Sequence, residues 1–149
     1  MTSTRSLLDH PIIAQRYFFP RPSTLADPVY VTVPEAQLAC WRSAPPSSRP
    51  VVVYFHGNGE IVGDWINLLP QLCHPAGYDV FLAEYRGYGA STGQPALYSM
   101  LEDVERIAQA VGVPTSQVVV FGRSVGSIYA LEWVSRFPDT RGLVIESGI

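Results

Sequence analysis

Short apolar runs alternate along the chain with stretches of helical periodicity, and turns rich in glycine and proline separate them. Continuous runs of β-branched residues predict strands buried on both faces. These are expected at residues 51–55, 79–84, 118–121 and 142–146. Helices are expected at residues 63–73, 95–110 and 124–137, where apolar residues recur at helical spacing. The alternation indicates an α/β fold with a mostly parallel sheet and helices on both faces.

The beginning of the chain has a different pattern. Four prolines interrupt residues 1–28, which we therefore expect to be irregular. The aromatic patch at residues 16–19 is predicted to cover the edge of the sheet. Residues 29–33 alternate like a strand, and residues 38–42 follow after a short turn, so an antiparallel hairpin is expected. The folded domain is expected to span residues 29–149.

Composition narrows the function classes. The 149 residues are 47% hydrophobic and 15% charged, which is typical of one well-buried domain. The net charge is −3 and no basic tract is present, so nucleic acid is not an expected partner. The apolar runs are too short to span a bilayer and no signal peptide is recognised, so a cytoplasmic protein is expected. Cys40 and Cys73 are expected to be buried thiols rather than a disulfide or a metal site.

One motif joins a predicted strand to a predicted helix. Gly122-Arg123-Ser124-Val125-Gly126 is a G-x-S-x-G sequence in the context strand, turn, helix. In such a turn the serine occupies a strained backbone that exposes its hydroxyl, and glycine is needed where a side chain would collide with the neighbouring strand or helix. The following amide, of Val125, lies at a helix N-terminus and is suited to stabilise an oxyanion. The motif predicts Ser124 as a nucleophile, and the alternative role is a helix N-cap.

Two further motifs accompany it, His56-Gly57-Asn58-Gly59 and the segment EYRGYG at residues 84–89. With all three motifs in this order, the chain resembles the α/β-hydrolase superfamily over roughly residues 29–149. It is most similar to a subgroup of serine esterases and thioesterases. The resemblance implies the sheet order 1-2-4-3-5-6.

The resemblance also implies roles for the residues that match. Ser124 would form an acyl-enzyme with a carboxylic ester or thioester of a small-molecule or acylated substrate. The amides of Val125 and Asn58 would form the oxyanion hole, with Gly59 as the alternative donor. His56 would orient this loop without acting as the base, and the glycines of the motifs would support the loop and the elbow: Gly57, Gly122 and Gly126. Neither a cofactor nor a metal is expected.

An acid and a histidine are expected after later strands in this family. The chain matches roughly the first two-thirds of a family domain, so we expect a truncated enzyme whose last strand, residues 142–146, has an exposed apolar edge. Such an edge favours a partner chain or self-association. The 149-residue chain alone is expected to be nearly inactive. Glu146 is the one candidate acid within it, and a loop-capping carboxylate is the other interpretation.

Other charged residues are expected to have structural roles. His10 and His74 are interpreted as surface or capping residues, and Glu84, Asp103 and Asp64 as turn, helix-surface and N-cap charges, respectively. Two other functions remain open. Gly57-Asn58-Gly59, with Glu84 ending the next strand, mimics a dinucleotide-binding fingerprint. A chain without the catalytic histidine is also consistent with a non-catalytic half that binds a partner.

Overall fold

The computed structural model describes residues 5–149. Its helices and strands follow in the order α1 (Arg5–Leu8), α2 (Pro11–Tyr17), β1 (Val29–Val33), β2 (Ala36–Arg42), β3 (Val51–Phe55), η1 (Val62–Asp64), α3 (Leu68–Cys73), η2 (His74–Ala76), β4 (Asp79–Ala83), α4 (Leu97–Val111), η3 (Thr115–Gln117), β5 (Val118–Arg123), α5 (Gly126–Arg136) and β6 (Gly142–Glu146). The strands of the sequence-based prediction are thereby confirmed to within two residues at either end. No helix of this described part is long and apolar enough to cross a membrane.

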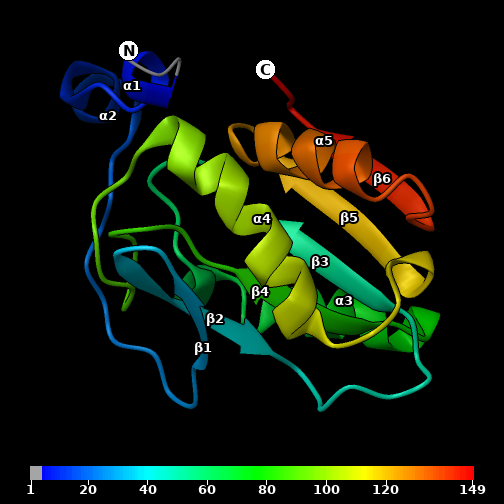
Figure 1. The fold of residues 1–149 in the computed structure, drawn as a ribbon. Coiled ribbons are helices and arrows are strands. Elements are labelled where there is room, and N and C mark those ends of the chain that lie inside the picture. Colours follow the sequence, from blue (N-terminus) through cyan, green and yellow to red (C-terminus); the bar gives the residue numbers. More distant parts are fainter. Residues whose placement is uncertain (1–4) are drawn as a thin grey trace.

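The strands form one sheet in the order β1-β2-β4-β3-β5-β6 (Figure 1). The β1–β2 and β2–β4 pairs are antiparallel, and the β4–β3, β3–β5 and β5–β6 pairs are parallel. This is the order that the family resemblance implies. In the register of the two central pairs, Phe55 is opposite both Ala83 and Gly122. The segments that follow β3, β4 and β5 therefore emerge side by side at one end of the sheet.

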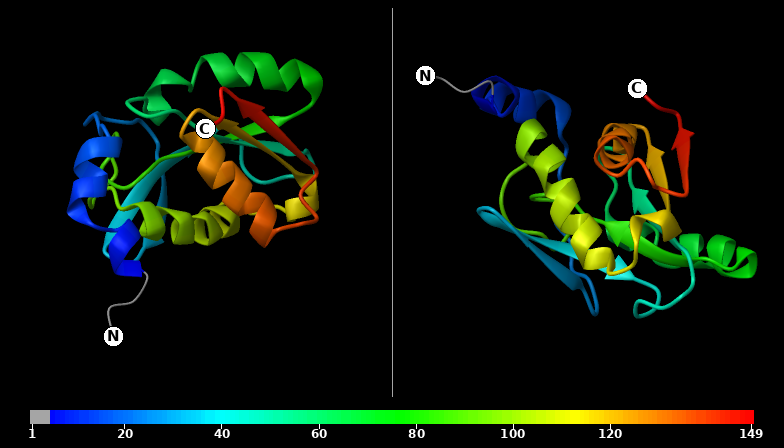
Figure 2. Two further views of the ribbon diagram at one scale, coloured as in Figure 1. Left: turned by 90° about the horizontal axis from the view of Figure 1, so that it is seen from above. Right: turned by 45° about the vertical axis from the view of Figure 1, so that its right-hand side comes forward.

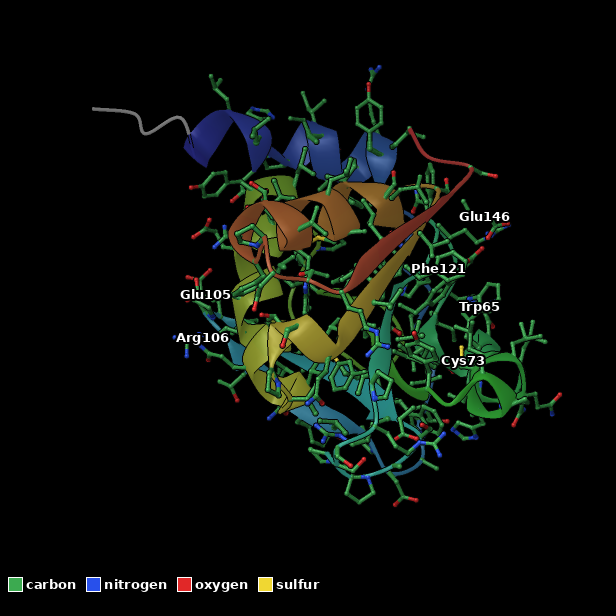
Figure 3. All side chains as sticks on the ribbon, turned by 90° about the vertical axis from the view of Figure 1, so that its right-hand side faces the viewer. Trp65, Cys73, Glu105, Arg106, Phe121 and Glu146 are labelled. Atoms are coloured by element: carbon green, nitrogen blue, oxygen red, sulfur yellow. The ribbon has the colours of Figure 1, made fainter. Side chains whose placement is uncertain are left out.

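Helices cover both faces of the sheet. Helices α4 and α5 lie on one face and α3 on the other, as the two views of Figure 2 show. Val53 and Phe55 of β3 belong to the larger core with α4 and α5, whereas Tyr54 belongs to the smaller core with Leu69 of α3. This alternation follows from the period of two along a strand. Figure 3 shows Trp65, Phe121 and Glu146 on the side of the sheet where α3 lies.

The prediction of an irregular N-terminal segment is wrong for residues 5–8 and 11–17, which form the short helices α1 and α2. Proline is tolerated at the first position of a helix, where its missing N–H is not needed. Pro11 occupies the first turn of α2, and the ring of His10 accepts a hydrogen bond from Ile12 N, so the interpretation of His10 as a capping residue is confirmed. In Figure 1, α1 and α2 lie beside the first turn of α4, at the end toward which β3 and β5 point.

The single helix expected at residues 63–73 is also wrong. The structure has the 3-10 turn η1, then a break, and then α3, which begins at Leu68. Pro70 explains the break, because a helix that began at Gly63 would place this proline in its interior. In α3 the same proline lies in the first turn. Asp64 accepts a hydrogen bond from Ile61 N, as a capping carboxylate does.

The interpretation of Asp103 as a helix-surface charge is wrong. Asp103 lies on the inner face of α4 and is only 3% exposed. Its carboxylate accepts two hydrogen bonds from Arg86, at 2.6 Å from Nε and 2.7 Å from Nη2. These hydrogen bonds raise the pKa of the Arg86 guanidinium. The pair fastens the turn after β4 to α4, since Arg86 belongs to the EYRGYG segment.

Candidate active site

Ser124 lies in the turn between β5 and α5, in the left-handed region with φ +51°. Its N–H donates to Glu146 O at 2.9 Å, and its carbonyl accepts from Ser127 N and from Ser127 Oγ. A non-glycine residue in this region is strained, and such strain at a strand–helix turn is what the G-x-S-x-G motif predicts.

The two motif glycines are required by close contacts. A Cβ atom on Gly122 would lie 2.6 Å from Gly126 O, and a Cβ atom on Gly126 would overlap the carbonyl of Phe55. The elbow therefore packs directly against the end of β3. A side chain at Gly126 would therefore push the elbow away from the loop that follows β3, and a side chain at Gly122 would push α5 away from β5.

That loop begins with His56, which is 1% exposed. Its Nε2 lies 2.5 Å from Glu84 Oε1, and its Nδ1 lies 2.8 Å from Gly57 O. Its carbonyl accepts a hydrogen bond from Tyr85 OH at 2.7 Å. Both ring nitrogens are thus engaged inside the protein, and neither faces Ser124.

Glu84 is equally buried, so its interpretation as a turn charge is wrong. Besides His56, its carboxylate accepts hydrogen bonds from Val62 N and Tyr85 N. A Cβ atom on Gly89 would lie 2.6 Å from Glu84 Oε2. This carboxylate is therefore enclosed by the chain and is not available to a ribose, which removes the structural basis for the dinucleotide-binding alternative.

Glu60 fastens the other end of the loop. Its Oε2 accepts hydrogen bonds from Gly57 N at 2.8 Å and from Trp65 Nε1 at 3.2 Å, and its Oε1 pairs with the Arg123 guanidinium. Arg123 precedes Ser124, so this ion pair connects the loop to the elbow. The Glu60 carboxylate is thus a structural connection within the described chain.

The side chain of Asn58 joins the loop to the N-terminal segment. Its Oδ1 accepts hydrogen bonds from Phe19 N at 3.0 Å and from Tyr88 OH at 2.7 Å, and its Nδ2 donates to Tyr17 O at 2.6 Å. Burial raises the pKa of Tyr88 to about 12, so its hydroxyl remains a donor at neutral pH. The aromatic patch at residues 16–19 therefore lies against this loop. The prediction that the patch covers the sheet edge is wrong.

Three backbone N–H groups, two in the loop after β3 and one in the elbow, donate no hydrogen bond within the described residues. Among the hydrogen bonds of residues 5–149, none has the backbone N–H of Asn58, Gly59 or Val125 as its donor. Asn58, Val125 and Ser124 line one cavity of about 440 Å³, whereas Gly59 does not line it. The other walls of this cavity are apolar. They come from α2 and the residue after it, from α4 and α5, and from a residue that follows β6: Ile13, Tyr17, Phe18, Leu97, Ile128 and Ile149.

The three histidines of the sequence lie elsewhere. His56 is held by Glu84 and Gly57, His10 caps α2, and His74 begins η2. Glu146 ends β6 and pairs with Arg123 Nε at 3.5 Å. In the part of the chain that the structure describes, neither a histidine nor a carboxylate is hydrogen-bonded to Ser124 Oγ.

The cysteines and acids form no metal centre within residues 5–149. Cys40 is buried, as predicted, and burial raises the pKa of its thiol to about 12. Cys73 is half-buried, and burial raises its pKa as well. Both cysteines are free thiols.

The sequence analysis assigned one site to the elbow after β5 and the loop after β3, and the structure places these two segments side by side. The assigned residues are Ser124, Val125, His56 and Gly57 to Gly59. Three features were missed: the His56–Glu84 pair, the side-chain role of Asn58 and the wall formed by α2. The strand pattern contains a signal for the His56–Glu84 pair. His56 and Glu84 directly follow Phe55 and Ala83, which are partners in the β3–β4 register.

Comparisons with known proteins agree with this geometry. A family model described as "alpha/beta hydrolase fold" matches residues 50–148. The "Alpha/beta hydrolase domain-containing protein aho-3" of Caenorhabditis elegans is 30% identical over 116 residues, which are 74% of this chain and 35% of that protein. "Protein bem46" of Schizosaccharomyces pombe is 29% identical over 111 residues, which are 71% of this chain and 37% of that protein. The chain thus spans about a third of the length of these curated relatives.

A solved structure gives the same fold. The crystal structure of a predicted CIB-like hydrolase from Thermoplasma acidophilum superposes with a TM-score of 0.67 and 22% sequence identity. The superposition covers 80% of this chain and 61% of that one. At this identity the similarity concerns the fold alone.

Proposed function

The chain belongs to the α/β-hydrolase fold family, and we propose that Ser124 is the nucleophile of a serine hydrolase acting on carboxylic esters or thioesters. One observation carries the proposal: Ser124, held at φ +51°, shares a cavity with Asn58 and Val125, whose amides have no partner within residues 5–149. A hydroxyl next to two unoccupied N–H donors is the arrangement that acyl transfer needs.

In the proposed reaction, Ser124 Oγ attacks the carbonyl carbon of the substrate while its proton passes to a base. The carbonyl oxygen becomes an oxyanion that accepts hydrogen bonds from Asn58 N and Val125 N. The C–O or C–S bond then breaks, and the alcohol or thiol leaves with a proton. Water then attacks the acyl-enzyme and gives its proton to the base. The carboxylic acid is released, and Ser124 Oγ regains its proton from that base. No cofactor takes part in this sequence of steps.

We further propose that the base is a histidine, oriented by an acid, and that both come from polypeptide other than residues 1–149. The three histidines of this chain support this, because none is placed at Ser124. The edge strand β6 supports it too, since Leu143, Val144 and Ile145 are each about 40% exposed. Additional strands paired with β6, from the same chain or from a partner, would extend the sheet next to Ser124. Residues 1–149 alone would then be nearly inactive.

Turnover measurements on the full natural polypeptide that contains this sequence test the proposal. Hydrolysis of p-nitrophenyl octanoate and of an octanoyl thioester is compared for the natural protein and for Ser124→Ala. Loss of the nucleophile is expected to lower kcat by on the order of 10⁴-fold or more. The control Ser135→Ala, an exposed serine of α5, should retain full activity. Unchanged hydrolysis by Ser124→Ala would overturn the proposal.

A further inference from the structure

Residues 9–19, here called the N-terminal strap, lie between two cavities. On one side, Ile13, Tyr17 and Phe18 line the cavity of about 440 Å³ that contains Ser124. On the other side, Ala14 and Gln15 line a second cavity of about 680 Å³. The strap thus separates the two cavities, and its residue Phe18 lines both of them.

From this placement we infer that the strap selects the acyl group, and that this group is an uncharged straight hydrocarbon chain of medium length. The inference rests on the proposed role of Ser124 and adds the substrate class and the residues that limit it. Ile13 and Tyr17 are the limiting residues, because they are the strap side chains of α2 that line the Ser124 cavity.

The chemistry of the cavity indicates the substrate class. No side chain that lines it is charged, and only Asn58 and Ser124 bring an amide or aliphatic hydroxyl group to it. A charged acyl group would lose hydration there without gaining a partner. An apolar cavity of about 150 Å³ accommodates benzene, so about 440 Å³ has room for a chain of on the order of ten carbons.

Hydrogen bonds hold the strap at both of its ends. At one end, Asp9 Oδ1 accepts from Tyr98 N at 2.7 Å and from Ser99 N at 3.2 Å, and Asp9 Oδ2 accepts from Ser99 Oγ at 2.6 Å. Asp9 thereby satisfies amides of the first turn of α4, where a carboxylate is favoured. At the other end, the Asn58 side chain binds Tyr17 O and Phe19 N.

Between these two attachments the strap is lightly packed. Phe18 is buried at 5% exposure, whereas α2 itself contains no buried residue. Ile13 itself is not part of the larger core, whereas its neighbour Ala14 packs against that core and Phe18 belongs to it. The hydrogen bonds at the ends and these two residues therefore fix the position of Ile13. A substitution at Ile13 changes the size of the cavity without disrupting the core, which makes the inference testable with folded protein.

The test measures binding of straight-chain carboxylates, from hexanoate to dodecanoate, to the full chain carrying Ser124→Ala. The longest chain that still gains affinity is determined by calorimetry, and methyl chemical shifts of Ile13, Leu97 and Ile128 report where the ligand lies. In this background Ile13→Trp fills the cavity, and Ile12→Trp is the matched control. Ile12 belongs to the same helix, is 55% exposed and does not line the cavity.

With Ile13→Trp we expect affinity for dodecanoate to fall by about tenfold, the loss that corresponds to about two methylene groups that no longer fit. Hexanoate binding should be unchanged, and Ile12→Trp should behave like its parent for the whole series. Equal effects of the two tryptophans, or an equal loss for every chain length, would overturn the inference.

The design separates this inference from the proposed function, because Ser124→Ala removes the nucleophile before any measurement. If Ser124 proves inert but binding still depends on chain length, the role of the cavity stands and the catalytic role of Ser124 falls. If Ser124 is catalytic but Ile13→Trp does not change the chain-length dependence, the catalytic role stands and the role of the strap falls.

Discussion

His56 Nε2 and Glu84 Oε1 lie 2.5 Å apart inside the protein, and each residue is 1% exposed. The other ring nitrogen, Nδ1, faces Gly57 O, which only accepts hydrogen bonds, so Nδ1 carries a proton. A hydrogen bond therefore joins Nε2 to the Glu84 carboxylate. The pair connects the end of β3 to the end of β4 and fixes the direction in which the loop with Asn58 leaves the sheet.

Removal of the carboxylate should destabilise the protein strongly. Glu84→Ala leaves the His56 ring and the amides of Val62 and Tyr85 without their partner, and we expect a loss of about 3–5 kcal/mol in the free energy of unfolding. Glu84→Gln retains the shape and can still hydrogen-bond a neutral ring, so about 1 kcal/mol is expected. Urea denaturation measures both values.

The control for this pair is Glu105→Ala. Glu105 is an exposed carboxylate of α4 that pairs with Arg136 at 3.3 Å, and its removal should change stability by less than about 1 kcal/mol. Equal losses for Glu84→Ala and Glu105→Ala would contradict the structural role of the buried pair.

Two glycines should respond very differently to the same substitution. Gly126→Ala forces a methyl group into the carbonyl of Phe55, and we expect a loss above about 4 kcal/mol. At Gly59, no atom lies within 4 Å of an added Cβ, and only its φ of +76° opposes a side chain. Gly59→Ala should therefore cost about 1–2 kcal/mol. Thermal or urea denaturation of the two variants checks the order, and similar losses would show that the elbow does not pack against β3 as described.

The strained backbone at Ser124 should lower the free energy of unfolding. Glycine adopts a φ of +51° without strain, so Ser124→Gly is expected to raise the free energy of unfolding by about 1 kcal/mol. Ser124→Ala keeps the strain and should leave stability nearly unchanged. The matched control, Ser135→Gly within α5, should lower it by about 0.5 kcal/mol. A loss of stability in Ser124→Gly would argue against a strained elbow.

Stability should decline at alkaline pH for a specific reason. Burial raises the pKa of Cys40 to about 12 from an ordinary value of 9.0, so above pH 9 the unfolded chain loses this proton while the folded chain keeps it. Stabilisation is therefore complete below about pH 9 and is lost as pH rises, with a slope of about 1.4 kcal/mol per pH unit for each such group. Burial raises the pKa of Tyr88 in the same sense, to about 12.

Cys40→Ala isolates the thiol in this measurement. The ten basic residues other than histidine are all arginine, so no lysine titrates in the same range. The variant should lose stability less steeply as pH rises from about 9 toward 12, because the other raised groups, Cys73 among them, contribute equally in both proteins. An identical slope for the two proteins would mean that the thiol is not protected from water in the folded state.

Much of the fold follows from local sequence. The β-branched runs define the strands because both faces of the central sheet are covered, and the G-x-S-x-G context places Ser124 at the end of β5. The N-terminal helices escaped prediction because their ends are fixed by tertiary contacts, above all by Asp9 on the first turn of α4. A proline-rich segment gives no periodic signal for such contacts.

The site was predictable where its geometry is local and not where it depends on pairing. The strained turn at Ser124 follows from five consecutive residues, whereas the contact between His56 and Glu84 depends on which strands are neighbours. The Asn58 side chain and Tyr17 are 41 residues apart in sequence, and only the folded chain brings them together. For the same reason the wall formed by Ile13 has no counterpart in any sequence motif.

The most direct test of the central claim is covalent labelling of the full natural polypeptide with a fluorophosphonate, followed by mass spectrometry of the peptides. Our account predicts one phosphonyl adduct, located on Ser124, which disappears in Ser124→Ala and persists in Ser135→Ala. An adduct on another residue, or labelling that Ser124→Ala leaves unchanged, would contradict the assignment of Ser124 as the nucleophile.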